Sequence, residues 1–484
     1  MSIKINIPHL SSRKTKIIAT LGPASNSQEV IHHLIKAGVN IFRLNMSHGK
    51  HEEHQKLYHL IRQSAAALNE PIAIFADLCG PKIRTGRFKN GSITIQANTE
   101  VIVTTRDVVG KDNLIPCQYT ALADDVRPGD RLLLDDGKFE LTVTSVQGED
   151  IACQVIFGGE LKNHKGMNLP GVQVSCPSMT EKDRADALFA LRLGVDYLAL
   201  SFVRKAEDVS ELRRLISENG CDTHIIAKIE KPEALSNAQA IIQAADAIMI
   251  ARGDLGVELN AEDVPVAQHQ LIRRARALNK PVIVATQMLE SMVENSRPTR
   301  AEVTDVSNAV YSATDAVMLS GETAAGRFPV EAVSMMARVI KQTEAFMREQ
   351  DAFGKLTHRA DEVRPLPFGD AVADATAQLC SDLRAKAIIG ITGSGMSVVT
   401  LSSARPLAPL IAVAADEHIC RRMNLYWGVV PVYSEQAGRV HPNKLARELS
   451  LSTGLVDKGD NIIVVRGFNK DKELNSPTIT MLTL

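Results

Sequence analysis

The chain has 484 residues, of which 45% are hydrophobic, and its 55 basic and 56 acidic side chains leave a formal net charge of −1. A chain of this length is expected to form roughly three domains, and its near-neutral charge argues against nucleic acid or a membrane surface as a partner. Seven scattered cysteines without a CxxC pair, and the lack of a signal-peptide core or an apolar membrane-spanning run, predict reduced thiols and a cytoplasmic protein that acts on small molecules.

Short β-rich runs alternate with helical patterns over residues 1–80, as in repeated βα units. In chain order, strands and helices are expected at 16–22, 28–37, 40–47, 51–68 and 71–78. Arg43, Asn45 and Ser47 share one face of the second strand, because side chains alternate along a strand. Such a face can hold an anion, although a strand end that meets solvent would show the same pattern.

Residues 81–176 change to short, glycine-punctuated β runs with hairpin turn signals such as Asp135-Asp136-Gly137. This pattern predicts an all-β domain inserted after the third strand. Near its end, Lys165 lies in a glycine-flanked loop from which its ammonium group can reach a phosphate.

The βα alternation resumes over residues 177–350. Helices and strands are expected in turn at 180–193, 197–203, 206–218, 225–230, 232–243, 247–251, 261–279, 281–287, 299–312, 316–320 and 329–349. Together with residues 1–80 this makes eight βα units, which predicts a closed (β/α)8 barrel with its active site at the carboxyl ends of the strands. Thr286, Ser320 and Glu322 fall at that end.

Two of these strands end in charged residues. Lys228 and Glu230 point to the same face, because they are two positions apart on one strand. The next apolar run, 247–251, is expected to belong to a strand that ends at Asp254, so the carboxylates of Glu230 and Asp254 converge at one edge if the two strands are parallel. Two hard oxygen ligands at such an edge suit Mg²⁺, and a structural ion pair is the alternative.

Residues 351–484 are expected to form a separate α/β domain after a charged, proline-bearing linker at about 350–368. Within this domain, helices are expected at 370–383 and from 417, and strands at 387–391, 409–414, 429–433 and 462–466. The loop 392–397 joins a strand to a helix and offers Thr392, Ser394, Gly395 and Ser397. The free N–H groups of such a helix start can bind the phosphate of an effector, and an ordinary tight turn is the alternative.

Nine motifs along the chain are shared with a known family. They are KIIATLGPA (16–24), FRLNMSHG (42–49), GPKIRTG (80–86), NLPG (168–171), IAKIEK (226–231), IARGDLG (250–256), ATQMLESM (285–292), RPTRAE (297–302) and MLSGETA (318–324). By these motifs the chain resembles pyruvate kinase, of the bacterial type, over nearly its full length.

The resemblance implies a barrel interrupted by a β lid and followed by a regulatory domain. It also implies a phosphotransferase that passes the phosphoryl group of phosphoenolpyruvate to ADP, giving pyruvate and ATP in the last step of glycolysis. Dependence on Mg²⁺ (or Mn²⁺), activation by a phosphorylated metabolite and a homotetrameric assembly are implied as well.

For the transferred group, the resemblance implies that Lys228 faces the phosphoryl and the developing enolate, while Arg43 clamps the phosphate. Glu230 and Asp254 are expected to hold the Mg²⁺. The substrate carboxylate is assigned to the amides of Gly253 and Asp254 together with Thr286.

Protonation of the methyl carbon is assigned to a water chain ordered by Thr286 and Ser320. On the nucleotide side, the resemblance implies phosphate contacts from Arg84, Lys165 and Asn45. Asn45, Ser47 and Asp77 would complete the phosphate and monovalent-cation region.

The chain departs from the family pattern at the K⁺ site. Members that need K⁺ have threonine after the aspartate of strand three and glutamate after Gly-Pro, whereas this chain has Leu78 and Lys82. Leu78 removes an oxygen ligand and Lys82 supplies an ammonium group. We therefore expect that K⁺ is not required.

Two rival functions share parts of this pattern. A metal-dependent aldolase or lyase acting on pyruvate enolates would use the same barrel and carboxylates, but would not need the lid or the phosphate-side cations. A catalytically idle sensor of sugar phosphates would keep the loop 392–397 and lose catalytic groups, yet Lys228, Glu230 and Asp254 are all present.

Overall fold

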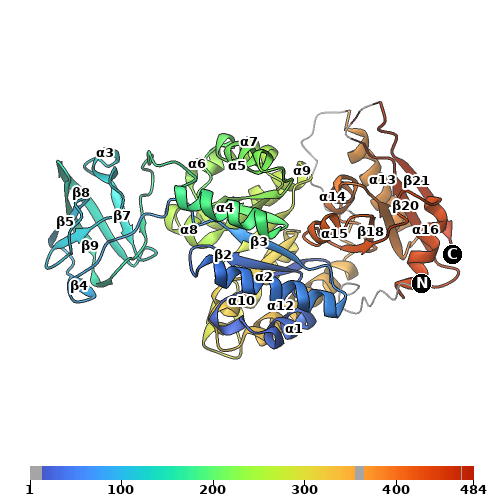
Figure 1. Ribbon diagram of the computed structural model, residues 1–484, viewed down its shortest axis with the longest axis horizontal. Coiled ribbons are helices and arrows are strands. Elements are labelled where there is room, and N and C mark those ends of the chain that lie inside the picture. The colour runs from blue at the N-terminus through green and yellow to red at the C-terminus, as the bar shows by residue number, and fades with distance from the viewer. Residues whose placement is uncertain (1–12, 355–364, 470, 472) are drawn as a thin grey trace.

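A computed structural model describes residues 13–354, 365–469, 471 and 473–484. The chain forms three parts along its longest axis: a β lid at one end, a barrel in the centre and an α/β domain at the other end (Figure 1). Most of the expected linker, residues 355–364, lies outside the described residues. Within the described part, no helix combines the length and the apolar character that a membrane crossing needs.

The central part is a closed barrel of eight parallel strands, as the repeated βα pattern predicted. The strands are β1 (Lys16–Thr20), β2 (Ile41–Asn45), β3 (Ala73–Asp77), β12 (Tyr197–Leu200), β13 (His224–Ile229), β14 (Ala247–Ala251), β15 (Val282–Ala285) and β16 (Ala316–Leu319). The barrel closes where β1 pairs with both β2 and β16. Almost every strand residue is buried, because one face fills the barrel and the other packs under the helices.

Helices surround the barrel and are listed here in chain order. They are α1 (Gln28–Ala37), α2 (His51–Leu68), α4 (Glu181–Leu193), α5 (Ala206–Glu218), α6 (Pro232–Ser236), α7 (Ala238–Ala244), α8 (Arg252–Glu258), α9 (Asp263–Ala277), α10 (Arg300–Tyr311), α11 (Gly321–Ala324) and α12 (Pro329–Glu349). Local signals set several ends: the side chain of Thr180 caps the start of α4, and Gly194 ends it in the left-handed conformation.

Two expectations for these helices were wrong in detail. The single helix expected over 232–243 is broken at Asn237, which separates α6 from α7. The run after β14 was expected to be a strand end, but it forms the short helix α8. Gly253 and Asp254 therefore lie in the first turn of a helix.

The lid contains its own hydrophobic core and two sheets. The larger sheet has the order β11-β7-β8-β9-β5-β6, and β10 pairs with β4 in a smaller one. The strands are β4 (Ser92–Ile95), β5 (Glu100–Thr104), β6 (Leu114–Pro116), β7 (Arg131–Leu134), β8 (Phe139–Gln147), β9 (Asp150–Phe157), β10 (Gly159–Lys162) and β11 (Met167–Asn168), with one short helix, α3 (Leu122–Asp125).

The C-terminal domain is a five-stranded sheet with the order β19-β18-β17-β20-β21, in which only β21 is antiparallel to its neighbour. Its elements are α13 (Phe368–Asp382), β17 (Ala387–Ile391), α14 (Met396–Ser403), β18 (Leu410–Ala414), α15 (Glu417–Met423), β19 (Val429–Tyr433), α16 (Pro442–Ser452), β20 (Asn461–Arg466) and β21 (Thr478–Thr483). The helix α16 and the strand β21 were not predicted from the sequence.

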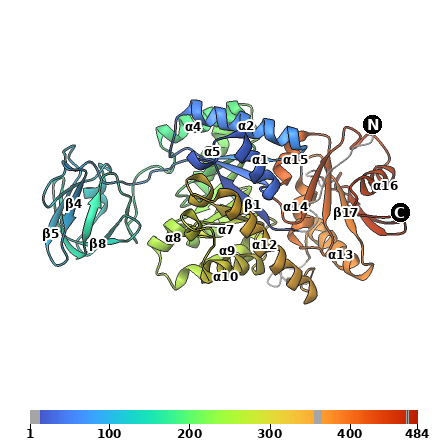
Figure 2. The ribbon, with the colours of Figure 1, turned by 90° about the horizontal axis from the view of Figure 1, so that it is seen from below.

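This domain packs against the barrel on the side away from the lid (Figure 2). It covers the amino ends of the barrel strands, where Lys16 Nζ donates to the carbonyl of Val429 (2.6 Å) and Tyr197 Oη donates to the carbonyl of Arg422 (2.7 Å). The carboxyl ends of the strands are therefore left to face the lid.

Candidate active site

Lys228 is the centre of a charged cluster at the carboxyl end of the barrel. Its Nζ donates to Ser201 Oγ (2.7 Å) and lies 2.9 Å from Glu230 Oε1 and 3.4 Å from Asp77 Oδ1. Burial opposes the charged form, but the two carboxylates outweigh it and raise the pKa of Lys228 above its usual value. The side chain is therefore a buried, fixed ammonium ion at neutral pH.

Asp77 joins Lys228 to Arg43. Arg43 donates through Nε (2.7 Å) and pairs through Nη2 (2.6 Å) with Asp77 Oδ2, while its Nη1 donates to Thr20 Oγ1 (3.3 Å). Burial alone would raise the pKa of Asp77, but Lys228 and Arg43 together lower it. The carboxylate thus holds two cations at the mouth of the barrel.

Glu230 carries a buried carboxylate whose charge interacts with that of Asp254. Glu230 Oε2 accepts from the amide of Phe202 (2.7 Å), whereas its buried Oε1 makes the ion pair with Lys228 without hydrogen-bond geometry. Burial raises the pKa of Glu230, and the charge of Asp254 adds to the effect. Two repelling carboxylates with an incompletely bonded oxygen suit Mg²⁺.

No group of three or more His, Cys, Asp or Glu side chains within the described residues is placed to hold a metal ion. A cation held by Glu230 and Asp254 would therefore take its other ligands from substrate oxygens and water, as Mg²⁺ commonly does in phosphoryl-transfer sites.

Thr286 adopts a backbone conformation that a β-branched residue rarely takes. Its φ is 70°, and the next residue, Gln287, has a φ of 54°. Thr286 Oγ1 accepts from the amide of Gly253 (2.6 Å) and donates to the carbonyl of Ala285 (2.6 Å). The strand expected to run to Gln287 thus ends at Ala285, and Thr286 turns toward α8 in a strained geometry of the kind that clusters at functional sites.

Ser320 lies at the end of β16 with a buried hydroxyl group that has no hydrogen-bond partner. Its amide donates to Glu322 Oε2 (2.7 Å), and Glu322 Oε1 accepts from the amide of Leu289 (3.1 Å). Burial raises the pKa of Glu322. An unpartnered hydroxyl in this position can hold a water molecule.

Asn45 ends β2, Ser47 follows it, and Arg84 lies at the base of the lid. Asn45 Oδ1 accepts from the amide of Ser47 (3.2 Å), so these two residues form a local turn after β2. Arg84 lies opposite Gly166 at the base of the lid, and burial together with the charges of Arg84, Arg43 and Lys82 lowers the pKa of His48 in the same turn.

Within the described part of the chain, Lys165 makes no ion pair or hydrogen bond with the residues of this cluster. It pairs through Nζ with Asp135 Oδ1 (2.9 Å) inside the lid. In this structure the ammonium of Lys165 is thus engaged by a carboxylate of the lid.

Two contributors were missed from the sequence: the hydroxyl of Ser201 and the amide of Phe202. Ser201 could have been found, because it is a polar residue directly after a buried strand, whereas the amide of Phe202 takes part through a contact with the distant Glu230. Lys82, which the sequence singled out as a source of positive charge, has its Nζ 3.1 Å from Asp254 Oδ1.

The loop 392–397 forms the start of α14 in the C-terminal domain. Gly395 has a φ of 84°, which favours glycine, and its amide donates to Thr392 Oγ1 (2.9 Å). Ser394 is exposed, but Ser397 is buried, so the hydroxyl of Ser397 is not on the loop surface.

Comparisons with known proteins agree with this architecture. The family model described as "Pyruvate kinase, barrel domain" matches residues 12–333, and "Pyruvate kinase, alpha/beta domain" matches residues 370–480. The chain is 44% identical to pyruvate kinase of Geobacillus stearothermophilus, covering 94% of this chain and 78% of that protein. It is 46% identical to pyruvate kinase 2 of Synechocystis sp., with 87% and 70% covered. The crystal structure of a pyruvate kinase from Cryptosporidium parvum superimposes with a TM-score of 0.90 at 37% identity, covering 98% of this chain and 97% of that one.

Proposed function

The chain belongs to the pyruvate kinase family, and from this premise we propose how its residues transfer the phosphoryl group of phosphoenolpyruvate to ADP. The observation that carries the proposal is the buried ammonium of Lys228, held between Asp77 and Glu230. The relatives named above are pyruvate kinases, so the aldolase alternative has no support. The test is the formation of ATP and pyruvate in equal amounts from phosphoenolpyruvate and ADP, followed with lactate dehydrogenase; an aldolase would release pyruvate without ADP.

Lys228 and Arg43 supply fixed positive charge where negative charge develops. Phosphoryl transfer spreads charge over the phosphoryl oxygens and the leaving enolate, so catalysis depends on groups that are already oriented. Lys228 would act on the phosphoryl and enolate oxygens, and Arg43 on the phosphate. Ser201 and Asp77 keep the ammonium from turning to solvent.

The family uses Mg²⁺, and we assign its protein ligands here to Glu230 and Asp254. When bound, the ion would neutralise charge on the phosphate and enolate oxygens. The carboxylate oxygens and their mutual repulsion fit either Mg²⁺ or Mn²⁺.

The substrate carboxylate is assigned to the amides of Gly253 and Asp254 with Thr286. The amide of Gly253 bonds to Thr286 Oγ1 in this structure, which keeps both groups at the start of α8. Thr286 and Ser320 are assigned to the water chain that delivers a proton to the methyl carbon, and the unpartnered hydroxyl of Ser320 supports this role.

The nucleotide phosphates are assigned to Asn45, Arg84 and Lys165, with Ser47 on the same side. For Lys165 this means exchanging Asp135 for a phosphate oxygen as the lid closes. We also propose a homotetramer, by likeness to the family, and a cytoplasmic location, which the seven cysteines support because all are described and all are free thiols.

Turnover is predicted to be independent of K⁺. The ammonium of Lys82 pairs with Asp254 (3.1 Å), so a cation is already attached to the site, and buried Leu78 offers no oxygen ligand. At saturating substrates and fixed Mg²⁺, rates with K⁺ and with tetramethylammonium at equal ionic strength should be nearly equal.

The matched variant for this test is the double change Leu78→Thr and Lys82→Glu, which restores an oxygen ligand and removes the ammonium. It should acquire a partial dependence on K⁺. A large, saturable stimulation of the unmodified enzyme by K⁺ would contradict the prediction.

The C-terminal loop is proposed to bind a phosphorylated activator through Thr392, Ser394, Gly395 and Ser397. It contains no lysine or arginine, and one helix start satisfies one phosphate, so a sugar or nucleoside monophosphate is favoured over a bisphosphate. Burial of Ser397 leaves the exposed Ser394 and the backbone amides as the main contacts.

Ser394→Asp is therefore expected to abolish activation, because it places a negative charge where the phosphate would sit. The measurement is the shift of the phosphoenolpyruvate saturation curve on adding a sugar monophosphate. Ser394→Asn is the neutral control of the same size and should retain part of the shift. Unchanged activation of Ser394→Asp would show that the effector binds elsewhere.

A further inference from the structure

Glu258, at the end of α8, joins three segments of the chain at one buried carboxylate. Its Oε1 accepts from Lys231 Nζ (2.6 Å) and from Asn168 Nδ2 (2.9 Å), and the side chain is 1% exposed. Its Oε2 is buried without a partner. We call Glu258, Lys231 and Asn168 the Glu258 junction.

Two arms of the Glu258 junction begin next to the proposed metal ligands. Lys231 directly follows Glu230, and Glu258 lies one helical turn after Asp254 in α8. The ion pair of Lys231 with Glu258 therefore ties the segment that carries one metal carboxylate to the segment that carries the other. The carboxylates of Glu230 and Asp254 repel each other, and this ion pair holds their two segments together against that repulsion.

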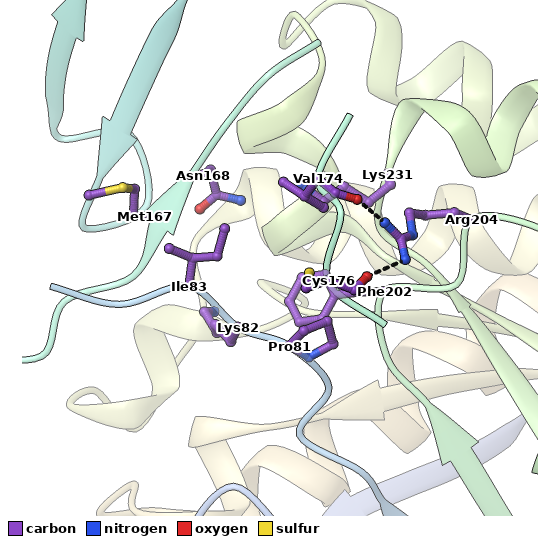
Figure 3. Close-up of a pocket in the computed structure, with 10 residues that line it drawn as sticks. All are labelled: Pro81, Lys82, Ile83, Met167, Asn168, Val174, Cys176, Phe202, Arg204 and Lys231. Carbon is purple, nitrogen blue, oxygen red and sulfur yellow. Dashed lines mark hydrogen bonds between the residues drawn. The ribbon is translucent and has the colours of Figure 1, made fainter. Parts of the chain in front are cut away.

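The third arm comes from the lid. Asn168 belongs to β11, which pairs with β7 in the large sheet of the lid. Figure 3 shows Asn168 on the lid side and Lys231 on the barrel side of a pocket. The pocket is lined in part by the two segments that connect the lid to the barrel, near residues 81–83 and 174–176. The pocket volume is about 20 Å³, enough for a water molecule and too small for a metabolite.

One connecting segment is also fixed to the barrel. Arg204 donates to the carbonyls of Val174 (2.6 Å) and Cys176 (2.7 Å), the two contacts drawn in Figure 3. The Glu258 junction is a second attachment, and it holds the lid sheet itself. The carboxylate of Glu258 thus contacts both the lid, through Asn168, and the segment that carries Glu230, through Lys231.

We propose that Glu258, Lys231 and Asn168 are positioning residues. They fix the distance between the metal ligands, and they fix the position of the lid relative to these ligands. This inference rests on the proposed assignment of Glu230 and Asp254 as metal ligands. It assigns distinct effects to the two arms: Lys231 acts on metal affinity, and Asn168 acts on the use of the nucleotide that the lid helps to bind.

The first test is direct binding of Mn²⁺ to the substrate-free enzyme, followed by electron paramagnetic resonance. Lys231→Met should raise the dissociation constant about tenfold, the usual result of removing a group that orients a metal ligand. Lys231→Arg keeps the charge and should restore most of the affinity. Arg213→Met, which breaks a similar ion pair with Asp246 before β14, is the matched control and should leave Mn²⁺ binding unchanged.

The second test compares the KM values of the two substrates. Asn168→Ala should raise the KM for ADP about fivefold, the loss of one hydrogen bond, with little change for phosphoenolpyruvate or Mn²⁺. Gln154→Ala, which removes a lid amide bonded within the lid, is the control. A purely structural role would instead reduce activity without this split between substrates.

Wild-type Mn²⁺ affinity in Lys231→Met, or equal changes of both KM values in Asn168→Ala, would overturn the inference. If Lys231→Met does not fold, Glu258→Gln takes its place with the same expected rise, because it keeps the side-chain volume and removes the charge. Asp254→Asn distinguishes failure of the metal-ligand assignment from failure of the positioning role. If this variant binds Mn²⁺ normally, the metal-ligand assignment itself is wrong.

Discussion

Lys228→Met is expected to reduce kcat by at least about 10²-fold while the KM for phosphoenolpyruvate changes little, because a fixed ammonium aimed at developing charge acts mainly in the transition state. The methionine fills the space of the lysine stem. In the variant, Asp77 still accepts from Arg43 and Glu230 still accepts from the amide of Phe202. Each carboxylate thus retains a partner, and the fold should persist. The measurement is steady-state turnover, with circular dichroism to check folding.

Lys16→Met is the matched control for Lys228→Met. Lys16 is also a buried strand lysine, but it lies at the opposite end of the barrel and donates to the carbonyl of Val429. This variant should lose stability at the domain contact and keep most of its turnover. Near-normal turnover in Lys228→Met with a native-like spectrum would show that the ammonium is not part of the chemistry.

Glu230→Gln is expected to lower kcat by about 10³-fold and to weaken Mn²⁺ binding measured without substrates. Charge neutralisation by a bound metal ion contributes several kcal/mol to the transition state, and the amide is a neutral, poorer ligand. The amide oxygen can still accept from Phe202, so the local backbone should stay in place.

Glu344→Gln controls for the loss of a buried carboxylate far from the site. Glu344 accepts from the amides of Lys14 and Thr15 at the amino end of the barrel, so its replacement should lower thermal stability without changing Mn²⁺ affinity. If Glu230→Gln binds Mn²⁺ as tightly as the unmodified enzyme, Glu230 is not a metal ligand.

Much of the fold follows from local pattern. The alternation of apolar runs and helical segments predicted eight barrel strands, and helix starts such as Thr180 carry their own capping groups. The same pattern failed where local signals were weak or conflicting. The break at Asn237, the turn of helix in α8 and the late elements α16 and β21 were all missed.

Part of the site was also visible in the sequence, because polar residues at strand ends interrupt otherwise buried runs. Arg43, Asp77, Lys228 and Glu230 do meet in one cluster in the structure. Thr286 was found as a polar strand end, but its left-handed conformation was not, since it depends on the contact with Gly253.

The barrel, the inserted lid and the charged strand ends could be derived from the amino-acid sequence, because they depend on periodicity and on residues close together in the chain. The contacts between distant groups became visible in the folded chain alone: Lys82 with Asp254, 172 positions apart, and Asn168 with Glu258, 90 positions apart. Such contacts arise when barrel closure and lid docking bring separate segments together, and the cost of burying each charge is met by a partner that local spacing does not specify.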